Sequence, residues 1–324
     1  MRGRFDLAVL ASLAVTILGG CLGTGEDRVL SITATGTVQG FVFFDQNGNG
    51  AFDGSDTPLR GVDVGLASFG SIVPVFRGTS DADGLLEIRR VDVATYEVVV
   101  DLATVGDTAQ VILKDPEDFT LTPSDTATVL VGISYRAASV EEVRQLPAGE
   151  KVFVEGIALN SRGTFGDNTV HLAGGALAIR VTDVAAGVIL PGDSLRFQGT
   201  TDVLNGQPVV TNARAFLLAI TEVPAPDTVT AAAAAGADGG SLDAALVYVD
   251  SVTVSDTATV AAGFQLTVDD VSGTLVILLD VDAPITDPPQ YIPTAVLDVV
   301  GLLVPDGAGA WVLKPRSDAD LTVR

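Results

Sequence analysis

The stretch GFVFFDQNGNGAFDGSDTPLRGVDVGL, residues 40–66, decides how the first part of this chain folds. It opens with an apolar, aromatic run and closes with the alternating VDVGL, and both compositions favour strands. Between these runs, Asp and Asn recur at alternate positions among glycines. We therefore expect two strands joined by a loop in which short oxygen-bearing side chains converge on one centre.

The loop follows the D-x-N-x-N-G register of an EF-hand calcium loop, with Gly50 at the sharp turn. Calcium accepts ~6–8 oxygen ligands in flexible geometry. The candidate ligands of a structural calcium ion are Asp45, Asn47, Asn49, the carbonyl of Ala51, Asp53 and Asp56. Because strands rather than helices flank the loop, we expect a structural clamp and not a sensor. A solvated, Asx-rich hairpin turn without metal is the alternative interpretation.

Together with TSDADGLLEI and ATYEVVVD further on, this stretch resembles the B-type repeats of serine–aspartate-repeat surface adhesins and the wider collagen-adhesin B class. Outside the loop, the matching residues are Pro58, Leu59, Gly61, Val62, Val64, Gly84, Tyr96 and Val98. The resemblance covers residues 36 to about 132 and implies a prealbumin-like β-sandwich that binds calcium through the loop. The sequence departs from the family at Ala94, where glycine is usual, and at Leu85 and Leu86, where an aromatic residue is common.

The charge and the rare residue types limit the function classes. Asp and Glu number 41 against 18 Lys and Arg, which gives a net charge of −23, and such a surface repels nucleic-acid phosphates. One Cys and one His exclude an intrachain disulfide and a Cys/His zinc cluster. His171 alternates with apolar neighbours, which is typical of a strand side chain, and no nucleophile–base motif surrounds it. We find no catalytic constellation and expect no enzyme.

The first 21 residues, MRGRFDLAVLASLAVTILGGC, have a basic start, an apolar run and small residues before Cys21. This order is that of a secretory signal, and LGGC resembles the lipobox of bacterial lipoproteins. The resemblance implies a signal peptide over residues 1–20, lipidation of Cys21, a tether over 21–35 and an extracytoplasmic, membrane-anchored protein. Leu22 after the cysteine favours the outer membrane or cell surface. The alternative is an ordinary signal peptide that contains a cysteine.

The rest of the chain reads as an all-β protein with an internal repeat. Each copy opens with a short helix signal, the capping box of Ser139 and Glu142 in one and the alanine run that stops at Gly236 in the other. Strand runs follow, and Gly199 in the first copy aligns with Gly301 in the second. Both copies resemble the OB-fold modules of bacterial extracellular nucleases and surface proteins. We expect a sandwich over 36–132, an OB-like domain over 134–222 and a second over 223–324.

The OB resemblance implies nucleic-acid or oligosaccharide binding, yet residues 228–310 contain no Lys or Arg. The candidate ligand-binding side chains are Arg162, Arg180, Arg196 and Arg214; scattered solvent-facing arginines are the alternative reading. We expect a lipid-anchored, non-enzymatic surface protein for binding or adhesion, whose partners are the membrane and an unidentified extracellular ligand or protein. The alternative is an accessory protein that binds nucleic acid or glycan beside an extracellular nuclease or hydrolase, with nucleic acid the less favoured ligand.

Overall fold

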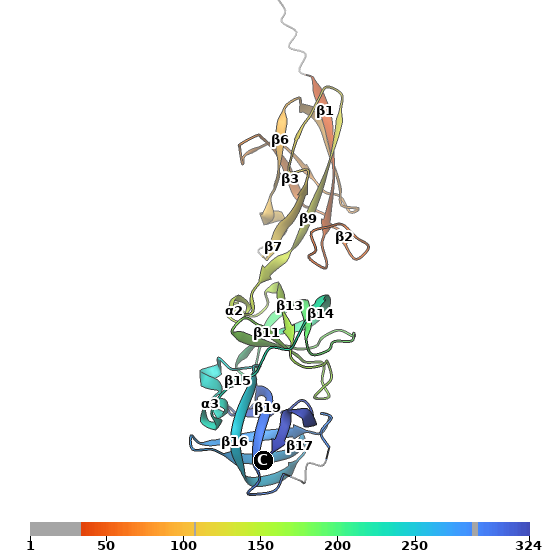
Figure 1. Cartoon of the computed structure of the whole chain (residues 1–324). Coiled ribbons are helices and arrows are strands. Elements are labelled where there is room, and N and C mark those ends of the chain that lie inside the picture. The colour runs from red at the N-terminus through yellow and green to blue at the C-terminus, as the bar shows by residue number, and fades with distance from the viewer. Residues whose placement is uncertain (1–33, 107, 287–290) are drawn as a thin grey trace, which may run out of the picture.

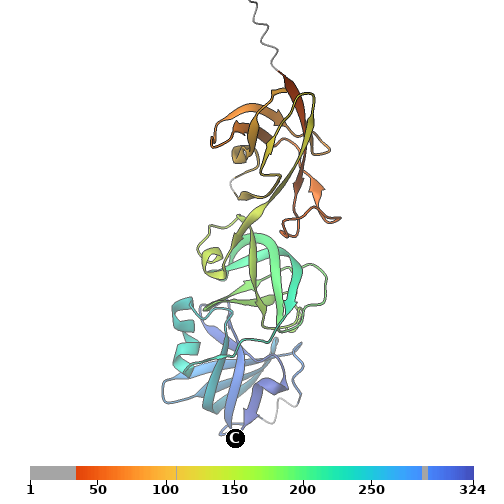
Figure 2. The same cartoon turned by 45° about the horizontal axis from the view of Figure 1, so that its top comes forward.

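The computed structural model describes residues 34–106, 108–286 and 291–324, which form three modules in series (Figure 1; Figure 2). The predicted signal peptide and Cys21 lie outside the described residues. The fold class is confirmed: the chain is all-β, with a prealbumin-like β-sandwich followed by two OB-like barrels. The chain enters the sandwich at one end of the molecule and ends in the module at the other end. None of the described helices is long and apolar enough to cross a membrane.

Two sheets pack face to face in the sandwich. In one sheet β1 pairs with β2, β5 and β9, and β9 also pairs with β7; the other has the order β4-β3-β6-β8. Inward residues such as Val38, Leu66, Tyr96 and Val131 are almost fully buried between them. The elements of this module are β1 (Thr35–Phe44), β2 (Thr57–Pro58), β3 (Asp63–Ser68), β4 (Pro74–Thr79), β5 (Leu85–Asp92), β6 (Thr95–Val100), η1 (Leu102–Thr104), β7 (Ala109–Asp115), β8 (Asp118–Thr120) and β9 (Thr126–Ala138).

Strand β9 belongs to two modules at once. It runs parallel to β1 as far as Ile133, and from Arg136 onward it pairs with β10 of the first barrel. Ser134 and Tyr135 lie between these two pairings, so no flexible linker separates the sandwich from the barrel. The long green-yellow strand in Figure 1 is this connection.

The first barrel is closed, because β10 pairs with both β11 and β13 in the order β11-β12-β14-β13-β10. Its opening helix is confirmed: the Ser139 side chain accepts from the Glu142 backbone, and the Glu142 side chain accepts from the Ser139 backbone. Val140 and Val143 turn inward and pack on the barrel core. The elements are α2 (Val140–Val143), β10 (Lys151–Ala158), β11 (Val170–Gly174), β12 (Leu177–Val181), β13 (Asp193–Leu204) and β14 (Gln207–Ile220).

The second barrel repeats this topology strand for strand. β16 pairs with β17 and β19, and the third and fifth strands, β18 and β20, run parallel as β12 and β14 do. Gly199 and Gly301 occupy the fourth strand of each barrel, where a Cβ would meet Val210 or Leu313 of the fifth strand. The elements are β15 (Asp227–Thr228), α3 (Ala231–Ala235), η2 (Ala237–Gly240), β16 (Leu246–Val260), β17 (Gly263–Asp269), β18 (Thr274–Asp280), β19 (Val296–Pro305), β20 (Trp311–Lys314), η4 (Asp318–Asp320) and β21 (Leu321–Val323).

Candidate functional site: the polar loop and the two module junctions

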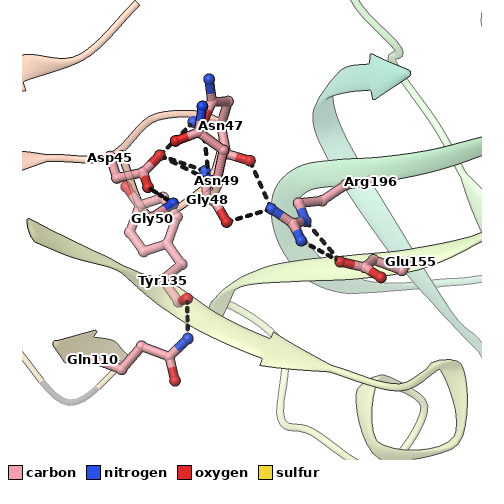
Figure 3. A network of polar contacts seen from close by, with 9 residues as sticks. All are labelled: Asp45, Asn47, Gly48, Asn49, Gly50, Gln110, Tyr135, Glu155 and Arg196. Carbon is pink, nitrogen blue, oxygen red and sulfur yellow. Dashed lines mark hydrogen bonds and ion pairs between the residues drawn. The ribbon is translucent and has the colours of Figure 1, made fainter. Parts of the chain in front are cut away.

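The polar loop begins directly after β1 and winds around the Asp45 carboxylate. Asp45 is fully buried, and one of its oxygens accepts the backbone N–H groups of Asn47, Gly48 and Asn49 while the other accepts that of Gly50 at 2.7 Å (Figure 3). Gly50 has a φ of 75°, a left-handed conformation that glycine adopts without strain. A single carboxylate therefore satisfies the donors of a whole turn.

Asp53 organises the other half of the loop. The side-chain amides of Asn47 and Asn49 donate to one of its oxygens at 2.8 and 3.0 Å, and Ser55 donates its hydroxyl and its backbone N–H to the other. The Ser55 hydroxyl and then its N–H, followed by Asn47, lower the pKa of Asp53 from 3.8 to about 2. The Asp56 carboxylate accepts the backbone N–H groups of Gln46 and Asp53.

The predicted calcium ligands lie together in this loop, hydrogen-bonded to one another and to its backbone. All the predicted ligands are oxygen-bearing groups, the kind that calcium prefers, and the amides of Asn47 and Asn49 meet at Asp53. A rotated amide offers its oxygen in place of its nitrogen. The carboxylates of Asp45 and Asp56, in contrast, point at backbone donors. Within the described ranges, no three His, Cys, Asp or Glu side chains are grouped so as to hold a metal ion.

Arg196 of β13 joins the loop to the first barrel. Its Nη1 donates to the carbonyl of Asn47 at 2.9 Å and to the carbonyl of Gly48, and its Nε donates to Glu155 of β10 at 2.7 Å (Figure 3). The guanidinium also lies near the ring of Phe153. The loop is thus fixed on one side by β1 and on the other by a charged side chain from the next module.

Beneath this clamp, the sandwich and the barrel share aromatic and polar contacts through β9. The Ser134 hydroxyl donates to the Asp45 carbonyl at 2.8 Å. Tyr135 packs edge-on against Phe44, with ring centroids 4.7 Å apart, and also contacts Phe153. This first junction therefore combines a continuous strand, an aromatic row and the Arg196 clamp.

The second junction, between the two barrels, contains a buried charge cluster. Asp243 is fully buried in the second barrel, with Arg180 of the first at 3.3 Å and Arg144 at 3.6 Å. Burial raises the pKa of Asp243 although both arginines oppose that shift, and burial lowers the pKa of Arg180. Both arginines also donate to backbone carbonyls, among them that of Gly240 across the junction.

An apolar core shared by both barrels lies at this junction. Arg316 of the second barrel adds a hydrogen bond of 2.8 Å to the carbonyl of Leu159. The core side chains come from both barrels and are Leu159, Phe165 and Ala178 of the first and Ala244, Leu246, Ala283 and Leu302 of the second. OB-folds bind ligands on the face of strands 2 and 3 and on the loop between strands 1 and 2. In the first barrel, Phe165 lies in that loop and Ala178 in strand 3, and both pack against the second barrel. The second barrel therefore covers part of this face.

The four candidate ligand-binding arginines do not gather on one face. Arg196 holds the polar loop, and Arg180 is only 5% exposed and faces Asp243. Arg162 donates to the carbonyl of Val184, and Arg214 lies over the Phe216 ring. The sequence pattern had no signal for Arg144 or Asp243 as junction residues, because their partners come from another module.

His171 is a strand residue, as its alternation predicts, and it is buried in β11. Its Nδ1–H donates to the Asn160 side-chain oxygen at 3.1 Å, and among the described residues its buried Nε2 has no hydrogen-bond partner. Burial, together with the positive charges of Arg180 and Lys314, lowers the pKa of His171 to about 3. The imidazole is therefore neutral at physiological pH.

No protein-family model matches this chain, and no curated protein matches it either. Among solved structures it is similar to GBS52, the minor pilin of Streptococcus agalactiae, at 18% identity and a TM-score of 0.25, over 32% of this chain and 45% of that one. This chain therefore spans less than half of the pilin's length. It is also similar to a murine DNA-binding protein bound with double-stranded DNA, at 11% identity and a TM-score of 0.29. That match covers 53% of this chain and 97% of the other. The Ifi202 HINa domain in complex with double-stranded DNA is similar at 13% identity and a TM-score of 0.28. The match covers 53% of this chain and 94% of that domain's chain. These likenesses are distant, and no function follows from them.

Proposed function

We propose that this protein is a lipid-anchored, non-enzymatic surface protein whose three modules form one stiff rod outside the cell. The observation that supports the proposal is that both junctions carry extensive contacts. The first has the shared strand β9 and Arg196, and the second has a shared apolar core and the buried ion pairs of Asp243. Such a rod holds a binding or adhesive face at a distance from the membrane. Its distal module would then meet the extracellular partner.

The anchor is tested by replacing the cysteine. The apolar leader and LGGC support Cys21 as the lipidated residue, 14 positions before β1 begins at Thr35. We expect the full chain made in a bacterial cell to partition with the membrane and to carry diacylglycerol by mass spectrometry. The Cys21→Ser variant should lose both properties. A wild-type protein that is secreted without lipid would contradict the anchor.

We also propose that the polar loop binds calcium as a structural ion. The oxygens would come from the predicted set: Asp45, Asn47, Asn49, the carbonyl of Ala51, Asp53 and Asp56. Calcium binding to the folded state stabilises it by RT ln(1 + [L]/Kd), about 2.7 kcal/mol at a hundredfold excess over Kd. Calcium added to chelator-treated protein should therefore raise the melting temperature.

The Asp53→Ala variant should lose that response, whereas Asp83→Ala, which removes an exposed carboxylate elsewhere in the sandwich, should keep it. A wild-type melting temperature that calcium does not change would contradict the calcium site and favour a hydrogen-bonded turn without metal.

The alternative function, an accessory protein that binds nucleic acid or glycan, is supported by the OB-like topology of both barrels. Against nucleic acid stand the absence of Lys and Arg from residues 228–310 and the arginines already engaged at the junctions. We expect no salt-dependent retention of the protein on single-stranded DNA. Retention that falls steeply with salt would favour this alternative.

A further inference from the structure

The hairpin between β3 and β4 carries an exposed apolar tip, formed by Phe69, Ile72 and Val73. These side chains are 66%, 86% and 67% exposed. In β4, Val75 extends the same apolar surface and is 57% exposed. Single exposed apolar side chains are common, whereas several on one projecting turn mark a contact site.

The apolar tip lies at the end of the sandwich where the chain enters it. The backbone N–H of Phe69 donates to the carbonyl of Thr95, and the N–H of Val93 donates to the carbonyl of Ala34. Thr95 of β6 and Val93 in the turn before it thus lie between the apolar tip and Ala34, the first described residue. The barrels extend from the opposite end of the sandwich, through β9 (Figure 1).

The sequence on either side of the apolar tip contains no charged residue. Residues 64–76 contain no Asp, Glu, Lys or Arg, in a protein whose net charge is −23. The nearby Glu97 accepts the backbone N–H of Gly70 at 3.1 Å, so its carboxylate closes the hairpin. A tip of this composition suits hydrocarbon better than a charged or polar partner.

The predicted anchor lies within reach of this end. Residues 22–33 separate Cys21 from Ala34, and extended chain spans at most ~3.3–3.6 Å per residue, so the tether reaches about 40 Å. A lipid on Cys21 would hold the apolar tip beside the bilayer at high effective concentration, where a weak apolar contact is sufficient.

We propose that the apolar tip inserts into the lipid bilayer next to the anchor and so fixes the tilt of the rod on the membrane. The inference rests on the proposed lipid anchor and adds a second membrane contact, made by Phe69, Ile72 and Val73. The two contacts together restrict rotation about the tether, which a single flexible anchor does not.

The test uses tryptophan fluorescence, because the wild type has one tryptophan, Trp311, in the distal barrel. Full-length protein made in bacteria is reconstituted into phosphatidylcholine vesicles that contain spin-labelled lipid. We expect the fluorescence added by Phe69→Trp to be quenched about twofold or more, as interfacial tryptophan is. The fluorescence of Trp311 should not change. As a matched control, Val271→Trp in the exposed β17–β18 turn should not be quenched.

Adding Ile72→Asp and Val73→Asp to Phe69→Trp should abolish the quenching, because charge opposes insertion. Protein that floats with the vesicles while Phe69→Trp stays unquenched would overturn the inference. Emission from that variant that depends on protein concentration, without quenching, would also overturn it in favour of contact with a second copy.

If the wild type does not float with the vesicles at all, the lipid anchor of the proposed function fails on its own. Coupling the Cys21 thiol to a maleimide phospholipid then supplies an anchor, and the same quenching comparison still decides whether the apolar tip inserts.

Discussion

The two junctions of this molecule are built on different physical principles. Between sandwich and first barrel, one strand passes through and a partly exposed Arg196 holds the polar loop by its carbonyls. Between the barrels, none of the described strands is shared; an apolar core is buried there, together with Asp243 and two arginines. At the first junction, the backbone hydrogen bonds of one continuous strand tie the two modules together. The second depends on burial, and it is therefore the one that a single substitution can open.

The two junctions should also differ in how strongly their ion pairs affect stability. Ion pairs near the surface are screened and contribute about 0–1 kcal/mol, whereas a buried charge that loses its partner costs several kcal/mol. The predictions below test this contrast between the junctions, from the largest expected effect to the smallest.

The Asp243→Ala variant should lose about 3–5 kcal/mol of unfolding free energy, since it leaves the nearly buried Arg180 and Arg144 without a counter-charge. Urea denaturation of the full chain measures this loss of unfolding free energy. The control is Glu87→Ala, which removes a carboxylate from the exposed pair with Arg89 and should change stability by less than about 1 kcal/mol. Equal losses in the two variants would show that the barrel junction is not the weak point.

Acid should weaken the first barrel through His171. Its folded pKa is about 3 against 6.5 unfolded, so between these values the unfolded chain binds the proton and the folded one does not. Stability is fully present above pH 6.5 and falls as pH drops toward 3, with a slope of up to about 1.4 kcal/mol per pH unit from this group. The stability of His171→Asn, measured by urea denaturation at several pH values, should depend less steeply on pH in that window. Parallel slopes for both proteins would contradict the buried neutral imidazole.

The Arg196→Ala variant should lose about 1.5–3 kcal/mol of unfolding free energy, the range for hydrogen bonds that involve a charged group. Because β9 still crosses the junction, we expect the sandwich to stay attached but the polar loop to exchange its amide hydrogens faster. Hydrogen exchange of residues 46–50 measures this. Arg214→Ala is the matched control, since that side chain lies over the ring of Phe216 in its own strand, β14. Unchanged exchange in Arg196→Ala would mean that the loop closes without the clamp.

Local sequence patterns predicted much of this fold. The capping box located α2, the alanine run located α3, and the internal repeat anticipated two barrels of the same topology, down to the paired glycines Gly199 and Gly301. Each of these features depends on residues near one another in the chain or on a repeated strand pattern.

The junction contacts could not be predicted in the same way. The sequence grouped Arg180 and Arg196 as ligand-binding candidates, whereas the structure places one against Asp243 and the other on the carbonyls of the polar loop. Which charges meet across a junction depends on how whole modules are placed, and no local spacing encodes that. Likewise, alternation along β9 marks a strand but does not show that it pairs in two modules.

Small-angle X-ray scattering of the chain from residue 22 onward tests the central claim, that the three modules form one stiff rod. We predict that a single arrangement of the three modules, placed as the described residues stand in Figure 1, accounts for the scattering profile and its maximum dimension. A profile that requires a mixture of bent and extended arrangements would contradict the claim.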